Sequence, residues 1–268
     1  MPRAVNDDVS LHYSVDGPSD APTVVLLEGL GYGRWMWRWL TDAIHEEYEV
    51  IRPDNRGTGK SDTPEGPYTI GEMADDVEAV LDHHGADAAA VVGASMGGMI
   101  GMQYALEYDR AEALGLLCTS PGGEEAVPTP EDVLDHIFST PDEYNRREAL
   151  KYRMEPAASE GFYEAEPDLV ERILDWRLAG DAADAGRNAQ AAAVEAFDVS
   201  DRLDELSLPT LVMHGTADRV LPVENGDLLA DRLPNAEYER VDGGSHLFFI
   251  EKRERVNERV REFLEAHV

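Results

Sequence analysis

The sequence predicts an α/β fold in which a mostly parallel, doubly wound sheet carries a helical cap insertion. Short apolar runs typical of buried strands alternate with helical patterns over residues 23–123 and again over residues 207–268. Between them, residues 124–206 contain helical patterns but no strand pattern. We therefore expect a core domain of residues 1–123 and 207–268, with residues 124–206 forming a cap over it.

The length and composition fit one large α/β domain with an insertion. The chain has 268 residues, of which 43% are hydrophobic, enough to bury a full core. No run approaches the roughly 20 apolar residues of a membrane span, and the first residues lack the pattern of a signal peptide, so we expect a cytoplasmic protein. The single cysteine, Cys118, excludes an internal disulfide, and we expect it to be buried without a role in the chemistry.

The net charge of −32 is unusual and results from 55 Asp and Glu against 23 Lys and Arg. Such a surface repels nucleic acid and anionic membranes, so we expect neither as a partner. The composition resembles that of cytoplasmic proteins from salt-accumulating halophiles; an acidic mesophilic protein is the alternative. Molar salt, with a Debye length of about 3 Å, screens the self-repulsion. We therefore expect stability and activity to rise from dilute buffer to molar KCl, and full stability in dilute buffer would contradict the halophile interpretation.

The first elements predict two strands followed by a glycine-rich loop. Residues 9–15 alternate between apolar and polar side chains, as in a half-exposed strand, and residues 23–27 form a continuous apolar strand. The loop E-G-L-G-Y-G follows, and a helix then opens with three tryptophans close together. Core packing accounts for two of the three, and we take Trp35 and Trp37 as the candidates for the one that lines a substrate pocket.

A second glycine-rich loop follows the strand at residues 49–52. Its sequence, P-D-N-R-G-T-G-K-S-D, matches neither of the common phosphate-binding patterns, so we expect a structural turn. The next helix begins at Thr69, which with Glu72 forms a capping box, and an apolar stripe follows. It ends at His83 and His84 before a glycine. Histidines and glycine are ordinary at a helix end, so we assign no metal site to the pair.

The apolar strand at residues 88–92 breaks into the motif G-A-S-M-G, and a helical pattern follows over residues 99–106. A sharp strand-to-helix turn of this type holds a serine in a strained backbone conformation and lifts its hydroxyl above the sheet. Gly93 and Gly97 flank Ser95 because side chains there would collide with the neighbouring strand and helix. A structural turn is the alternative; we interpret Ser95 as a nucleophile because a strand precedes it and a helix follows it.

The cap patterns are all helical. They follow a strand predicted at residues 113–118. Threonine–proline pairs at 129–130 and 140–141 each indicate a helix start, and further helical patterns cover residues 169–176 and 182–197.

After the cap the alternation of strands and helices resumes. Strands are predicted at residues 208–214 and 236–241, and helices at residues 223–233 and 248–267. The first of these strands ends in G-T-A-D and the second in D-G-G-S-H, so a polar side chain follows each strand.

Three residues that could form a catalytic triad follow three of the predicted strands: Ser95, Asp218 and His246. The carboxyl ends of parallel strands lie along one edge of a sheet, where ligands bind. A serine hydroxyl needs a base, an imidazole has a suitable ordinary pKa near 6.5, and a carboxylate can fix the imidazole tautomer. Asp242 and Asp198 are rival acids, but Asp218 follows its strand at the expected place.

Two backbone N–H groups are candidates for an oxyanion hole. The negative oxygen of a tetrahedral intermediate needs two donors, and losing one typically costs about 3–4 kcal/mol. The N–H of Met96, directly after the candidate nucleophile, is one. The N–H of Leu30, in the first glycine-rich loop, is the other.

These motifs resemble those of the α/β-hydrolase fold superfamily over nearly the whole chain. The matching segments are E-G-L-G-Y-G, D-N-R-G-T-G-K-S-D, V-V-G-A-S-M-G-G-M-I, L-V-M-H-G-T-A-D and G-G-S-H. The serine segment is similar to that of the group containing 3-oxoadipate enol-lactonases, cofactor-free haloperoxidase-like esterases and anthracycline methylesterases. This resemblance implies hydrolysis of a small-molecule ester or lactone through an acyl-enzyme, without metal or other cofactor. A serine at position 95 separates the chain from haloalkane dehalogenases and epoxide hydrolases, whose nucleophile is aspartate.

The departure from the resemblance is Glu28, where the family usually carries histidine or asparagine. A carboxylate about 5 Å from the oxyanion would oppose it by about 3 kcal/mol at an effective dielectric of 20. We therefore expect Glu28 to turn away and pair with Arg56 or Arg34, or to accept hydrogen bonds from loop N–H groups. Glu28→Gln should then cost stability more than activity.

Three other functions stay open at this point. A carbon–carbon bond hydrolase or a perhydrolase would use the same triad, and a non-catalytic ligand-binding protein would often lack one of its members. Organophosphonate labelling that Ser95→Ala abolishes would separate an enzyme from a binder. The apolar cap faces predict a pocket for a small or medium apolar acyl or ring group, and no pattern in the sequence indicates an oligomeric state.

Overall fold

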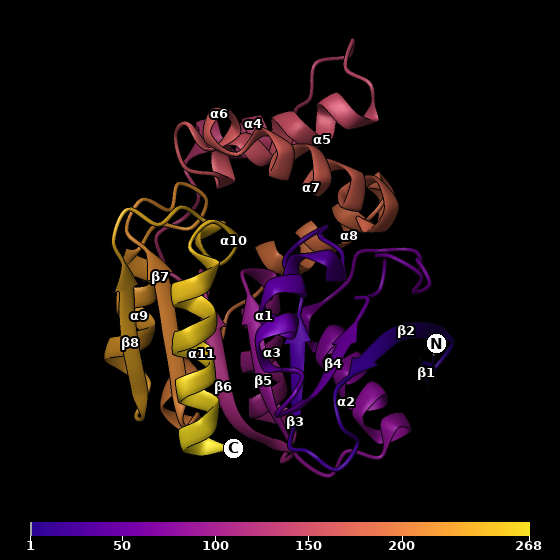
Figure 1. The fold of residues 1–268 in the computed structure, drawn as a ribbon, viewed down its shortest axis with the longest axis vertical. Helices are drawn as coiled ribbons and strands as arrows, with labels where there is room; N and C mark the ends of the chain where they lie inside the picture. The colour runs from indigo at the N-terminus through magenta and orange to yellow at the C-terminus, as the bar shows by residue number, and fades with distance from the viewer. Residues whose placement is uncertain (1) are drawn as a thin grey trace.

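Figure 1 shows the computed structural model, which describes residues 2–268, as a sheet with helices on both faces and more helices above one edge. Within these residues the sheet has eight strands in the order β1-β2-β4-β3-β5-β6-β7-β8. Neighbours from β4 to β8 in this order are parallel, whereas β2 pairs antiparallel with β1 and β4. The predicted class of a mostly parallel α/β sheet is confirmed. The strands are β1 (Arg3–Asn6), β2 (Val9–Asp16), β3 (Thr23–Leu27), β4 (Glu49–Pro53), β5 (Ala89–Ala94), β6 (Ala111–Leu117), β7 (Thr210–Gly215) and β8 (Ala236–Val241).

Helices cover both faces of the sheet, and each face buries its own apolar cluster. The helices of one face are α1 (Arg38–Ile44) and α11 (Arg253–His267), and those of the other are α2 (Ile70–His84), α3 (Met96–Glu107) and α9 (Glu224–Arg232). The capping box at Thr69 and Glu72 is confirmed. The last predicted helix is divided at Lys252 into a short α10 (Phe248–Glu251) and α11.

The sequence pattern does not predict β1. This strand has four residues, of which only Ala4 is buried, so it lacks the apolar run that indicates a strand. Its pairing with β2 follows from a tight turn in which Asp7 takes a positive φ of 50°.

The chain between β6 and β7 forms the helices α4 (Glu131–Phe138), α5 (Arg146–Met154), α6 (Phe162–Ala165), α7 (Pro167–Gly180) and α8 (Asp184–Glu195). Figure 1 shows α4–α7 grouped above the end of the sheet. The predicted helix start at the 140–141 pair is wrong. Helix α5 begins after Asn145, whose side chain accepts hydrogen bonds from the N–H groups of Arg147 and Glu148, so this residue provides the stronger cap.

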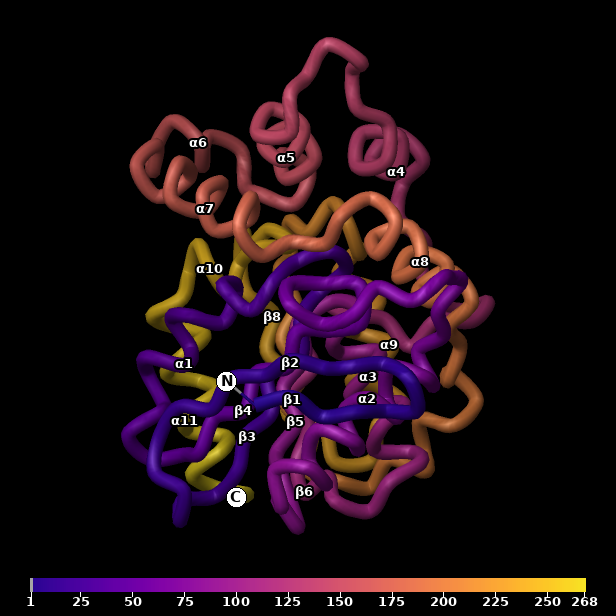
Figure 2. The backbone as a smooth tube through the Cα atoms, turned by 90° about the vertical axis from the view of Figure 1, so that its right-hand side faces the viewer, coloured from indigo at the N-terminus to yellow at the C-terminus, as the bar shows by residue number. Residues whose placement is uncertain are grey.

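Helix α8 packs on the loop after β4 and on the face of the core that carries α2 and α3. A Cβ on Gly186 would lie 2.3 Å from the Gly57 carbonyl oxygen, so the two backbones touch. Ala189 and Ala193 belong to the same apolar cluster as α2 and α3. Figure 2 shows α8 lower on the molecule than α4 and α5, beside the core.

The loop after β4 is the structural turn that its sequence predicts. The Asp54 carboxylate accepts a hydrogen bond from the Lys60 N–H at 3.0 Å, and the backbone carbonyl of Asp54 accepts one from the Ser61 hydroxyl at 2.6 Å.

Across residues 2–268, no helix combines the length and apolar character that a membrane crossing needs.

Candidate active site

Ser95 lies between β5 and α3 with a φ of +54°, in the left-handed region that side chains rarely adopt. A Cβ on Gly93 would lie 2.1 Å from the Gly97 carbonyl oxygen, and one on Gly97 would lie 2.1 Å from the Leu27 carbonyl oxygen. Only glycine fits at either position. The expected steric reason for the two glycines is therefore confirmed, and the turn that strains Ser95 is built into the packing of β3, β5 and α3.

The backbone of Ser95 is held on both sides. Its N–H donates to the Leu117 carbonyl at 2.9 Å, and its carbonyl accepts from the Thr119 hydroxyl at 2.7 Å. Leu117 is the last residue of the neighbouring strand β6, and Thr119 comes two residues later. The side chain of Ser95 lines a cavity of about 830 Å³ between the sheet edge and the helices above it.

Asp218 and His246, which follow β7 and β8, are in direct contact. His246 Nδ1 and Asp218 Oδ2 are 2.7 Å apart. The other carboxylate oxygen of Asp218 accepts the N–H groups of Val220 and Leu221 at 2.8 and 2.9 Å. His246 lines the same cavity as Ser95, so the structure brings all three candidates to one edge of the sheet.

The surroundings of Asp218 keep its carboxylate ionised. Burial acts to raise its pKa, but the charge of His246 and the hydrogen bonds from His214 and His246 outweigh burial and lower the pKa to about 2. The rival acids Asp242 and Asp198 are both exposed, and the carboxylate of Asp198 bonds Ser200.

His214 is a contact of Asp218 that the sequence pattern did not single out. It is the last residue but one of β7 and is fully buried. Its Nε2 lies 2.8 Å from the Leu221 carbonyl and 3.4 Å from the Asp218 carboxylate. The segment L-V-M-H-G-T-A-D contains this histidine four residues before the aspartate, which is the only signal that could have indicated it.

The two candidate oxyanion donors lie on either side of Ser95. Met96 is the first residue of α3, and Leu30 lies in the loop after β3. A Cβ on Gly29 would lie 3.7 Å from Ser95 Cβ, so this loop runs directly beside the serine. Within residues 2–268, neither the N–H of Leu30 nor that of Met96 donates to a protein acceptor. Of the two residues, Leu30 lines the cavity.

Neither of the predicted substrate-binding candidates, Trp35 and Trp37, lines the cavity. Trp35 is 7% exposed and donates its indole N–H to Asp181, and Trp37 is 1% exposed and packs against Phe249. The 3-10 turn Arg34–Trp37 explains the result: it turns Met36 toward the cavity and both tryptophans into the core.

Glu28 does not pair with either predicted arginine. Arg34 binds Asp54 at 2.6 Å, and Arg56 binds Asp76 at 2.6 Å. The Glu28 side chain is fully buried, where one oxygen accepts the Asn55 N–H at 3.4 Å and the other has no partner. Of the expected arrangements, only the bond to a loop N–H is found.

Burial, followed by the charge of Asp54, raises the pKa of Glu28 well above its ordinary value. The surroundings of Glu28 therefore disfavour a negative charge on its carboxyl group.

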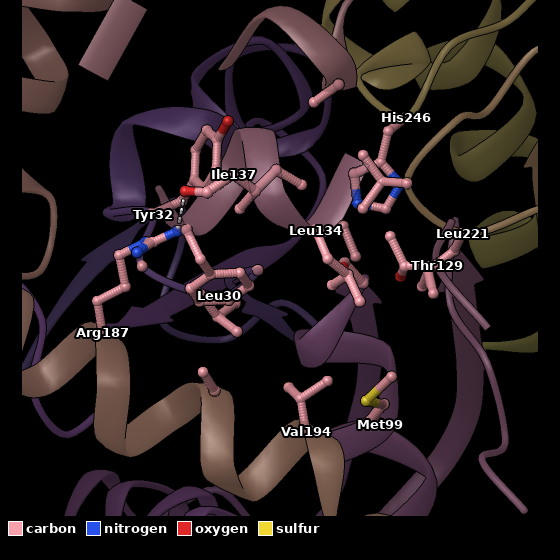
Figure 3. Close-up of a pocket in the computed structure, with 18 of the residues that line it drawn as sticks. Leu30, Tyr32, Met99, Thr129, Leu134, Ile137, Arg187, Val194, Leu221 and His246 are labelled. Atoms are coloured by element: carbon pink, nitrogen blue, oxygen red, sulfur yellow. Dashed lines mark hydrogen bonds between the residues drawn. The ribbon is translucent and has the colours of Figure 1, made fainter. Parts of the chain in front are cut away.

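The upper part of the cavity contains charged side chains that the sequence pattern did not predict. Arg153, Arg177 and Arg187, from α5, α7 and α8, all line it. Figure 3 shows Arg187 and Tyr32 at one end of the cavity and His246 and Leu221 at the other. Asp135, Asp181 and Glu195 also line the cavity. The remaining lining is largely apolar, with Leu134, Ile137, Val194 and Met99 among its members.

Three residues of doubtful role have ordinary structural contacts. His83 bonds the Tyr13 hydroxyl at 2.8 Å, and His84 lies 3.0 Å from the Glu49 carboxylate. Cys118 is fully buried, as expected, and burial raises its pKa well above the ordinary value.

The model of the alpha/beta hydrolase fold family matches residues 22–253. A 3-oxoadipate enol-lactonase 2 of Acinetobacter baylyi is 31% identical over 258 residues, covering 94% of this chain and 92% of that protein. A putative carbamate hydrolase, RutD, of Azorhizobium caulinodans is 31% identical over 92% of each protein. The crystal structure of the enol-lactonase from Burkholderia xenovorans is similar with a TM-score of 0.87 and 29% identity, covering 98% of this chain and 100% of that one. The chain therefore belongs to the alpha/beta hydrolase fold family and is a hydrolase.

Proposed function

We propose that the protein hydrolyses carboxylic ester or lactone bonds through an acyl-enzyme intermediate on Ser95, with His246 and Asp218 completing the triad. The contact of 2.7 Å between His246 Nδ1 and the ionised Asp218, in a cavity that Ser95 also lines, is the observation that carries the proposal. The names of the relatives, among them two enol-lactonases and an esterase from Thermogutta terrifontis, support the same bond type.

In the proposed reaction, Ser95 Oγ attacks the carbonyl carbon while its proton passes to Nε2 of His246. The carbonyl oxygen becomes negative and accepts the N–H groups of Leu30 and Met96. The intermediate collapses when His246 returns the proton to the leaving alkoxide. Water then attacks the acyl-enzyme by the same route, and the carboxylic acid and free Ser95 result. In a lactone the leaving hydroxyl stays attached to the acyl chain.

Within this proposal, the cavity favours a substrate that carries a second, ionised carboxylate. Arg187 has no carboxylate within 4 Å among residues 2–268, although its guanidinium donates to the Ile137 carbonyl at 2.8 Å. Burial, followed by the charges of Arg153 and Arg177, lowers the pKa of Arg187 to about 10. An anionic group would relieve this concentration of positive charge. The name of the relative from Acinetobacter baylyi, 3-oxoadipate enol-lactonase 2, is consistent with such a substrate.

A panel of esters and lactones, assayed in molar KCl with the wild type and Ser95→Ala, tests the proposal. We expect hydrolysis by the wild type and its loss in the variant. Release of an acyl product from a carbon–carbon bond, or transfer of the acyl group to peroxide in preference to water, would favour the alternative hydrolase or perhydrolase. No turnover of any ester or lactone would contradict the proposal.

A further inference from the structure

The loop of residues 29–33, which carries Leu30, is tied to the segment above the sheet by a set of hydrogen bonds. The Gly31 N–H donates to Gln190 Oε1 at 2.8 Å, and the Gly31 carbonyl accepts from the Ala182 N–H at 3.0 Å. The Gly33 N–H donates to the Asp181 carboxylate at 3.1 Å. Each of these partners lies more than 140 residues away in the sequence, between β6 and β7. The shape of the loop is therefore set by the insertion as well as by β3.

Gln190 is held in a single orientation. Its side chain is fully buried, and its amide nitrogen donates to the Arg56 carbonyl at 2.8 Å and to the Thr58 hydroxyl at 2.9 Å. Because the nitrogen faces two acceptors and the oxygen faces the Gly31 N–H, exchanging the two atoms would break all three bonds. Gln190 therefore connects the loops after β3 and β4 to α8.

Asp181 makes a second anchor at the end of α7. One carboxylate oxygen accepts the Gly33 N–H and the Trp35 indole N–H, the latter at 2.7 Å, and the other accepts Arg177 Nε at 2.7 Å. A Cβ on Gly33 would lie 2.5 Å from the Gly180 carbonyl oxygen, so α7 ends directly against the loop. Asp181 is 8% exposed, and these bonds form away from water.

The anchored residues determine where the Leu30 N–H points. The Gly29 carbonyl accepts from the Tyr32 N–H at 3.1 Å, closing a turn in which Gly31 has a φ of +75°. In a trans peptide the carbonyl of Gly29 and the N–H of Leu30 point in opposite directions. The N–H of Leu30 is therefore directed away from Tyr32 as long as the turn is intact. Both backbone polar groups of Gly31, the residue with positive φ, are held by Gln190 and Ala182.

We propose that Gln190 and Asp181 are positioning residues that hold the Leu30 N–H in the orientation required of an oxyanion donor. The inference rests on the proposed serine-hydrolase function. It implies that the part of the insertion from Asp181 to Gln190 belongs to the oxyanion site and is not a lid that separates from it. Disturbing these bonds weakens binding of the negatively charged intermediate more than binding of the neutral ester.

Gln190→Met tests the first anchor, because methionine has a similar size but offers the Gly31 N–H only a weakly accepting sulfur in place of the amide oxygen. The number of active sites is counted by organophosphonate labelling, and kcat, KM and the inhibition constant of a trifluoromethyl ketone are measured. We expect kcat to fall about tenfold or more, approaching the 10²–10³ of a lost oxyanion donor. KM should stay within about twofold, and the ketone, which forms an oxyanion, should lose affinity by the same factor as kcat.

Thr58→Val is the matched control. It removes one acceptor of the Gln190 amide but leaves the Arg56 carbonyl and the bond to Gly31 in place. Its kcat should stay within about threefold of the wild type even if its thermal stability falls as much as that of Gln190→Met. Equal losses of kcat in the two variants, or unchanged kcat and ketone affinity in Gln190→Met, would overturn the proposal.

A second pair keeps the proposal testable if Gln190→Met does not fold. Asp181→Asn retains an oxygen that can accept the Gly33 and Trp35 N–H groups, and Asp181→Ala removes it. Asp181→Asn should retain most of kcat, and Asp181→Ala should lose it with KM nearly unchanged. Equal kcat in both variants would contradict the role of Asp181. If the wild type neither hydrolyses esters nor reacts with the phosphonate, the proposed function itself fails and not this inference.

Discussion

Two buried carboxyl groups at the same edge of the sheet have opposite surroundings. Asp218, after β7, has hydrogen-bond donors on both oxygens, from two backbone N–H groups and His246. Glu28, after β3, has one long hydrogen bond and an oxygen without a partner. The pKa of Asp218 is lowered to about 2, whereas burial raises that of Glu28 well above the ordinary value.

Along this edge of the sheet, a negative charge is therefore favoured on Asp218 and disfavoured on Glu28. A negative charge is retained next to His246, where an imidazolium would form during the proposed reaction. On the side of Leu30, where the oxyanion would form, burial disfavours the charged form of Glu28. A charged Glu28 would oppose that oxyanion by about 3 kcal/mol at an effective dielectric of 20.

Removing the charge on the Asp218 side should have the largest effect. In Asp218→Asn the amide leaves the His246 imidazole in the wrong tautomer, and kcat should fall by about 10⁴-fold. Steady-state kinetics with any ester that the wild type hydrolyses measures this. A fall of less than tenfold would mean that another group orients His246.

Arg187→Gln should act on substrate binding at the far end of the cavity. Hydrogen bonds to charged groups contribute about 1.5–3 kcal/mol, so KM for a monoester of a dicarboxylic acid should rise about 10–100-fold. The matched neutral diester should show little change. Arg147→Gln, on the exposed side of α5, is the control. Equal effects on the two esters would remove the argument for an anionic substrate.

The stability contributed by Asp218 should disappear in acid. Its folded-state pKa is lower than the ordinary 3.8, so the ionised carboxylate stabilises the fold above about pH 4, and that contribution is lost as the pH falls toward 2. The free energy of urea unfolding of the wild type and Asp218→Asn should therefore converge by about 2 kcal/mol between pH 5 and pH 2. A constant difference across this range would show that folding does not lower the pKa of Asp218.

Glu28→Gln should show the opposite pH dependence. The raised folded-state pKa means that the wild type loses stability as the pH rises above about 4.5, while the neutral glutamine does not. The free energy of unfolding of the variant should rise relative to that of the wild type by at most about 1.4 kcal/mol per pH unit until Glu28 is ionised. The kcat of the variant should change little. This replaces the expectation that the substitution costs stability, which assumed an arginine partner or hydrogen bonds from loop N–H groups. Glu131→Gln on α4 controls for removing one surface charge, and a large fall in kcat of Glu28→Gln would give Glu28 a part in the chemistry.

The fold and the residues at the strand ends could be predicted because their signals are local. Ser95, Asp218 and His246 each follow a strand within a few residues, and parallel strands end at one edge. The strain at Ser95 likewise follows from the glycines that flank it.

The contacts that depend on distant segments could not be predicted. Asp54 and Asp76 bind the arginines expected for Glu28, and only the packing of α2 and of the loop after β4 determines this. Gln190 and Arg187 lie on one amphipathic helix, whose periodicity identifies a buried face but not its neighbours. The tryptophan cluster correctly indicates buried side chains but does not indicate which of them line the cavity. The reason is that these residues form a 3-10 turn, whose period differs from that of a helix.

Intact-protein mass spectrometry after reaction with a fluorophosphonate tests the central claim most directly. The account predicts one phosphonyl adduct per chain in the wild type, located on the peptide that contains Ser95. It predicts no adduct in Ser95→Ala and much slower labelling in Asp218→Asn, because His246 would no longer accept the serine proton. An adduct that persists in Ser95→Ala, or none in the wild type at a salt concentration where it is folded, would contradict the assignment of Ser95 as the nucleophile.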